Sequence, residues 1–86
     1  IFAVQMNDGP LQPALADYKA DCLANRVPPG DGEFDCVGFV RLLAEMGVDA
    51  PISVEVCSTT LWAGPIDDAA RAGADGMRHV LTEAGV

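Results

Sequence analysis

The sequence is short of positive charge, of aromatic side chains and of long apolar runs. Only 5 Lys and Arg residues stand against 13 Asp and Glu residues, which gives a net charge of −8 over 86 residues. Proteins that bind DNA or RNA gain much of their affinity from basic patches, so we expect no nucleic-acid partner for such an acidic chain. No apolar run approaches the ~20 residues of a membrane-spanning helix, so we expect no membrane partner either.

Cysteine is also scarce. The three cysteines, Cys22, Cys36 and Cys57, form no C-x-x-C pair, and an odd number does not complete a disulfide framework. We interpret them as small buried hydrophobes in a reducing compartment, and we expect a cytoplasmic protein. The chain starts Ile1-Phe2-Ala3-Val4 without a basic segment, which is not the start of a secretory signal, and this suggests a piece of a longer protein.

Half of the residues are apolar, which is enough for a packed core and excludes a disordered chain. The apolar residues among the first six positions predict a β-strand, ended by Asn7-Asp8-Gly9-Pro10. Apolar side chains at helical spacing predict a short amphipathic helix within residues 11–26: Leu15, Tyr18, Cys22 and Leu23. Two prolines and two glycines exclude a regular element within residues 27–35.

The second half of the chain is predicted to form a helix, a strand and a second helix. Asp35 is the predicted N-cap of a helix over residues 36–46, and Gly47 is its predicted stop. The apolar stripe of this helix consists of Phe39, Leu42, Leu43 and Met46. Residues 51–56 are rich in β-branched side chains and predict a strand. Pro65 predicts the first turn of a last helix whose apolar positions are Ala70, Gly73, Met77, Val80, Leu81 and Ala84.

This order of elements predicts an α/β fold in which two parallel strands are joined by a right-handed crossover. A parallel sheet needs further strands at its edges and cover on its faces, so two such strands do not form a stable sheet alone. We therefore expect the neighbouring strands to come from the rest of a longer chain or from another copy of this one.

Polar side chains near the ends of both predicted strands are the candidates for chemistry. Glu55 lies among apolar β-branched residues, and burial of an unpaired carboxylate there costs several kcal/mol. It is a candidate acid, base or metal ligand, or else a solvent-facing residue of an edge strand. At the end of the first strand, Gln5, Asn7 and Asp8 are candidates for binding substrate hydroxyls, or else part of a plain Asx turn.

Arg26 precedes a rigid Pro-Pro-Gly turn, and its guanidinium suits an oxyanion or sugar hydroxyls, or else an ion pair with a nearby carboxylate. The Gly30-Asp31-Gly32 segment is not a dinucleotide fingerprint, because no strand immediately precedes it and the third glycine is missing. The alternating acids from Asp31 to Asp35 lack the glycine and glutamate that a calcium loop requires. His79, the single histidine, is expected at the surface or in packing.

Four stretches together resemble the sugar phosphate isomerase/epimerase family of xylose isomerase-like TIM barrels: residues 4–8, residues 26–35, the helix that ends at Met46-Gly47, and Ser53-Val54-Glu55-Val56. The resemblance implies that residues 1–86 are the last two βα units of a (β/α)8 barrel. It also implies an enzyme that moves a proton next to the carbonyl of a sugar or polyol through an enediolate, assisted by a divalent metal (Mn, Mg or Co).

The resemblance assigns roles to particular residues. Glu55 would bind the metal and move the proton, and Gln5 stands where many members have a metal-binding His. Arg26 would contact substrate oxygens, beside the candidates Gln5, Asn7 and Asp8. Other ligands would come from the remainder of the barrel, so we expect the 86 residues alone to be inactive. The alternatives are a non-catalytic fragment, a self-associating α/β interaction module, and a barrel with dehydratase or lyase chemistry.

Overall fold

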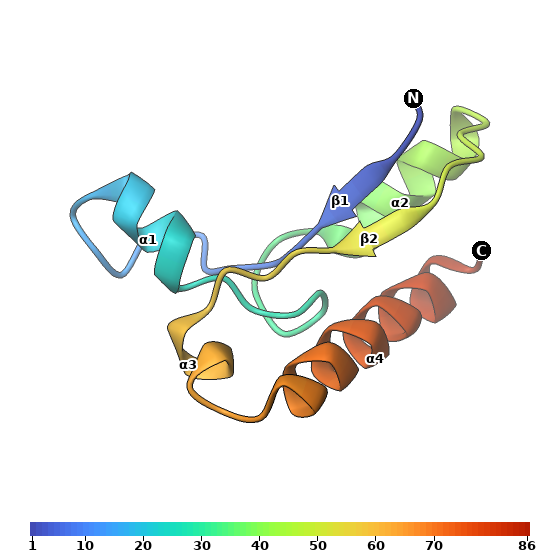
Figure 1. The fold of residues 1–86 in the computed structure, drawn as a ribbon. Coiled ribbons are helices and arrows are strands. Elements are labelled where there is room, and N and C mark those ends of the chain that lie inside the picture. The colour runs from blue at the N-terminus through green and yellow to red at the C-terminus, as the bar shows by residue number, and fades with distance from the viewer.

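A computed structural model describes all 86 residues (Figure 1). The elements follow in the order β1 (Val4–Met6), α1 (Tyr18–Ala24), α2 (Cys36–Glu45), β2 (Ile52–Val54), α3 (Thr59–Trp62) and α4 (Ile66–Ala84). The two strands pair in parallel, with Gln5 opposite Ser53 and Met6 opposite Val54. The prediction of an α/β fold with two parallel strands is therefore confirmed. None of the helices combines the length and the apolar character needed to cross a membrane.

The core lies on one face of this small sheet. It is built from two residues each of β1, α2 and α4, namely Val4, Met6, Cys36, Val40, Met77 and Val80. Ile52 and Val54 of β2 pack against its border. Each apolar side chain that is fully removed from water contributes roughly 1.5–3 kcal/mol, so these contacts hold α2 and α4 against the strands. The opposite face of the sheet carries exposed polar side chains, and no element of the chain covers it.

Helix α2 begins as predicted but turns a different face to the core. The Asp35 carboxylate accepts a hydrogen bond from the Gly38 amide at 2.9 Å, which confirms this residue as the N-cap. The residues that pack inward are Cys36 and Val40, with Leu43 half-buried. Most of the predicted stripe is exposed: Phe39, Leu42 and Met46. Because α2 is apolar along two adjacent stripes, its sequence alone does not indicate which stripe meets α4.

Helix α4 is confirmed, and three of its predicted inward positions, Gly73, Met77 and Val80, are buried. Helix α3 was not predicted, although Ser58 caps it by accepting a hydrogen bond from the Leu61 amide at 3.2 Å. The predicted short helix within residues 11–26 is present as α1, but three of its four predicted apolar positions are exposed: Leu15, Tyr18 and Leu23. Hydrogen bonds accepted by the Asp17 and Asp21 side chains hold α1 in place.

Candidate active site

The carboxyl ends of both strands are tied together by residues 25–27, which we call the crossing segment. Val27 forms an antiparallel bridge with Asp8, just after β1, and Asn25 forms one with Ser58, beyond β2. The Arg26 amide donates to the Cys57 carbonyl at 2.9 Å. The crossing segment therefore carries Arg26 to the edge where both parallel strands end, and α1 projects beyond this end of the sheet (Figure 1).

Gln5, Ser53 and Glu55 form the polar face of the sheet, away from α4. Side chains alternate along a strand, and the inward positions Ile52 and Val54 flank Ser53. The Glu55 amide donates to the Met6 carbonyl at 3.1 Å, so the parallel ladder continues to this residue and the alternation reaches it. Gln5 pairs directly with Ser53, which makes Gln5 and Glu55 diagonal neighbours on one face. Glu55 is exposed and belongs to none of the three ion pairs of the chain.

Arg26 is half-buried, and its direct side-chain contacts are with uncharged groups. Its Nη2 donates to the Cys22 Sγ at 3.1 Å and to the Tyr18 hydroxyl at 3.4 Å. The guanidinium carbon lies 4.9 Å from the centre of the Phe34 ring, within the range of a cation–π contact. The hydrogen bond to Tyr18 is the main cause that raises the pKa of Arg26, so the guanidinium stays charged. The alternative of an ion pair with a neighbouring carboxylate is not what the structure contains.

Asp8 is buried, with 1% of its surface exposed, and it supports the loop instead of facing the polar face. Its Oδ1 accepts hydrogen bonds from the amides of Gly9 and Phe34 at 2.7 and 2.9 Å, and its Oδ2 accepts one from Gly30 at 3.0 Å. The contact of Asp8 with substrate stays a prediction. Asn7 is half-buried, and its carbonyl accepts a hydrogen bond from the Cys36 thiol at 3.5 Å.

Sequence reasoning missed the residues that hold Arg26 in place. Tyr18 and Cys22 of α1 contact the guanidinium, and Asp21 fixes α1 itself. The buried Asp21 carboxylate accepts from the amides of Ala14 and Leu15 and from the Asn25 side chain, and these hydrogen bonds lower its pKa, that from Asn25 most. The spacing of Tyr18, Cys22 and Arg26, four residues apart, is the signal that could have revealed this cluster.

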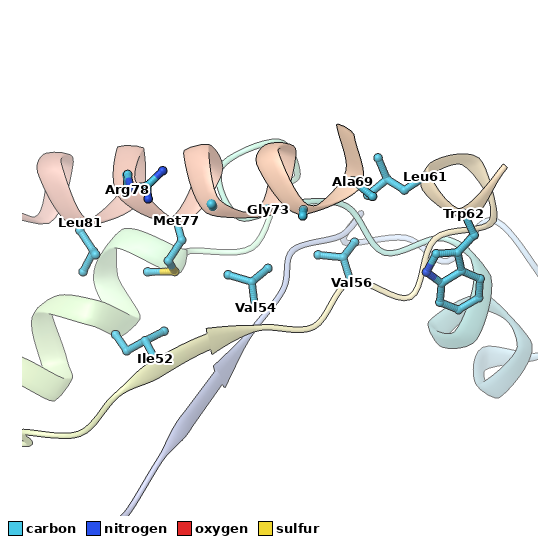
Figure 2. Close-up of a pocket in the computed structure, with 12 residues that line it drawn as sticks. Ile52, Val54, Val56, Leu61, Trp62, Ala69, Gly73, Met77, Arg78 and Leu81 are labelled. Carbon is cyan, nitrogen blue, oxygen red and sulfur yellow. The ribbon is translucent and has the colours of Figure 1, made fainter. Parts of the chain in front are cut away.

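The largest hollow of the chain is not at this edge. It measures about 510 Å³ and lies between β2 and α4, where Ile52, Val54 and Val56 point toward the helix (Figure 2). Its lining is almost entirely apolar, and it lies on the side of β2 opposite the polar face. A smaller hollow of about 260 Å³ borders Arg26 and has a polar lining that includes Asn25, Asp31, Ser58 and Thr60. Of the candidate residues, only Arg26 lines this smaller hollow, whereas Gln5 and Glu55 lie on the polar face.

The chain contains no complete metal site. No group of three or more His, Cys, Asp or Glu side chains could hold an ion within these 86 residues. Glu55 and Gln5 offer one carboxylate and one amide oxygen from the same face, and oxygen ligands of these kinds suit Mg²⁺ and Mn²⁺. The donor set therefore fits a metal of this type only when further ligands come from elsewhere.

No family model matches the chain. It is 35% identical over 81 residues to a 3-dehydroshikimate dehydratase of Pseudomonas putida, a match that covers 94% of this chain and 12% of that protein. Its fold matches a solved xylose isomerase-like TIM barrel/4-hydroxyphenylpyruvate dioxygenase fusion protein with a TM-score of 0.64 and 33% identity, over 87% of this chain and 11% of the other. The chain thus spans only about a tenth of the relatives it matches. In sequence and in fold, the chain is therefore similar to a short portion of these proteins, one of which is a xylose isomerase-like TIM barrel fusion protein.

Proposed function

We propose that this chain supplies part of the active site of a barrel enzyme that removes a proton from the carbon next to a carbonyl group. The observation that carries the proposal is the grouping of Glu55 and Gln5 on an uncovered polar face, with the charged Arg26 at the same end of the strands. In TIM barrels the active site lies at the carboxyl ends of the strands, which is where these groups lie.

Each residue has a role that its chemistry allows. The Glu55 carboxylate can accept the proton or help to hold a cation, and the Gln5 amide oxygen can join it as a ligand. Loss of the proton leaves negative charge on the carbonyl oxygen, and the fixed positive charge of Arg26 stabilises such an oxyanion. A divalent metal held by Glu55, Gln5 and ligands from other strands would polarise the same carbonyl.

Two outcomes can follow from the same proton removal. The similarity to a 3-dehydroshikimate dehydratase supports dehydration, in which a hydroxyl leaves from the neighbouring carbon and takes up a proton to form water. The resemblance of residues 26–35 and of Glu55 to sugar phosphate isomerases supports isomerisation or epimerisation of a sugar or polyol, in which a proton returns to carbon through an enediolate. We favour dehydration because 81 aligned residues carry that similarity.

The test uses the protein that carries these 86 residues, incubated with 3-dehydroshikimate or with ketoses in D₂O and followed by ¹H NMR. Dehydration produces new signals of protons bound to unsaturated carbons, whereas isomerisation replaces a carbon-bound proton of the product with deuterium, so that its signal is lost. Glu55→Gln should lower kcat by about 100- to 10,000-fold, the usual contribution of a general base. Glu45→Gln, an exposed site at the end of α2, is the matched control and should leave kcat unchanged. Full activity in Glu55→Gln would contradict the proposal.

A second candidate is a self-associating interaction module, favoured by the apolar hollow between β2 and α4. Such a surface, left open, is an expected docking site for the remainder of a barrel or for another copy of the chain. Light scattering of the 86-residue chain separates the two functions, because a module forms an oligomer of defined mass. The three free cysteines fit the cytoplasm for either function.

A further inference from the structure

Arg26 forms no direct ion pair in the chain, although the chain carries an excess of acidic groups and, beside the hydrogen bond to Tyr18, the nearby Asp21 carboxylate contributes to raising the pKa of Arg26. The three ion pairs all lie on α4 and leave Arg26 out. Its contacts are a thiol, a phenol and an aromatic ring, all of them uncharged. A half-buried cation whose direct contacts are uncharged still attracts an incoming anion, because no carboxylate is paired with it at hydrogen-bond distance.

Tyr18 stands beside this cation with a hydrogen to donate. A guanidinium only donates hydrogen bonds, so in the 3.4 Å contact with Arg26 the Tyr18 hydroxyl is the acceptor. Its own hydrogen remains free for a third group. Tyr18 is 61% exposed, which leaves a ligand room to approach it.

The position of Tyr18 is fixed from both ends of α1. At the start, the Asp17 side chain accepts hydrogen bonds from the amides of Lys19 and Ala20 at 3.0 and 3.3 Å. Toward the end, the Asp21 carboxylate accepts one from the Asn25 side chain, which belongs to the crossing segment. The relative placement of Tyr18 and Arg26 is therefore built into the fold and needs no ligand to form.

We propose that Tyr18 is a specificity-determining residue which, together with Arg26, binds an anionic oxygen of the substrate. Resting on the proposed function, this inference makes the substrate an anion, with a carboxylate or a phosphate as the group that is recognised. The guanidinium would supply the charge, and the phenol would donate a second hydrogen bond to the same oxygen. No covalent step is required of Tyr18.

Binding measurements on the protein that carries these residues test the proposal without relying on turnover. Isothermal titration calorimetry would use 3-dehydroshikimate, its methyl ester and inorganic phosphate as probes. Tyr18→Phe keeps the ring but removes the hydroxyl, and it should raise the Kd of the anionic probe that binds by about tenfold, as expected for one hydrogen bond to a charged group. The uncharged ester should bind Tyr18→Phe and the unchanged protein equally. Lys19→Gln, next to Tyr18 on α1, is the control and should not change Kd.

The outcomes separate this proposal from the proposed reaction. If 3-dehydroshikimate binds with a Tyr18-dependent Kd but is not converted, the reaction is wrong and the anion site stands. If phosphate shows the Tyr18 dependence instead, the recognised group is a phosphate. The proposal is overturned if neither anion binds, if Tyr18→Phe leaves Kd unchanged, or if the ester loses as much affinity as the acid.

Discussion

Replacing Asp8 with alanine should strongly destabilise the loop that joins β1 to residues 30–34. The buried carboxylate accepts three hydrogen bonds, from the amides of Gly9, Gly30 and Phe34. Asp8→Ala leaves these donors without an acceptor, and each buried unsatisfied group costs about 1–3 kcal/mol. Because water will reach some of them, we expect a total loss of about 3–5 kcal/mol, against a typical domain stability of roughly 5–15 kcal/mol.

The assay is urea denaturation followed by circular dichroism, in the protein that carries these residues. Asp8→Asn keeps one acceptor oxygen and should lose about half as much stability. Its amide nitrogen cannot accept a hydrogen bond, so the backbone amides that faced the replaced carboxylate oxygen lose their acceptor. Asp31→Ala is the matched control: Asp31 lies in the same loop, is exposed and should change stability by less than about 0.5 kcal/mol. If Asp8→Ala were no more destabilising than Asp31→Ala, the role of Asp8 in holding the loop would be refuted.

Three further predictions concern acid, thiol chemistry and a tight backbone contact. The pKa of Asp21 is lowered from 3.8, chiefly by the hydrogen bond from the Asn25 side chain. The ionised carboxylate therefore stabilises the fold fully above pH 3.8, and this stabilisation is lost as the pH falls through the lowered pKa. Acid titrations of the free energy of unfolding should show a shallower loss in Asp21→Asn. Burial raises the pKa of the Cys36 thiol, so iodoacetamide should modify Cys36 last, as mass spectrometry of the native protein can check; equal rates at Cys22, Cys36 and Cys57 would contradict this. Gly32→Ala would place a methyl group 2.7 Å from the backbone of Gly9 and should lower the denaturation midpoint, whereas Gly64→Ala, with its nearest neighbour at 3.7 Å, should not; equal midpoints would refute the contact.

The parts of the fold that sequence predicted correctly are those with local signals. Asp35 before a helical pattern and Gly47 after it set the ends of α2, and the β-branched run from Ile52 set β2. The stripe of α2 was predicted wrongly because the choice of face depends on where α4 packs, which no local pattern encodes. The same holds around α1: Leu15 and Leu23 have helical spacing, but about half of each side chain stays exposed because no other element packs on them.

The candidate site, too, was predicted from the sequence only in part. The sequence singled out Glu55, Gln5 and Arg26, and the structure brings all three to one end of the sheet through strand pairing and the crossing segment. It did not distinguish Asp8, which holds the loop, from residues that face the polar side. That distinction depends on which amides surround a carboxylate, and the Gly30 and Phe34 amides come from 22 and 26 residues away.

The sheet of two strands has a further consequence for handling the chain by itself. Each strand is hydrogen-bonded along one edge only, so every strand in this sheet is an edge strand. Unpaired N–H and C=O groups on an edge recruit other strands, and the apolar inward side chains of β1 and β2 contain no charge that would oppose stacking. Raising the concentration should therefore drive the isolated 86 residues toward fibrous precipitates.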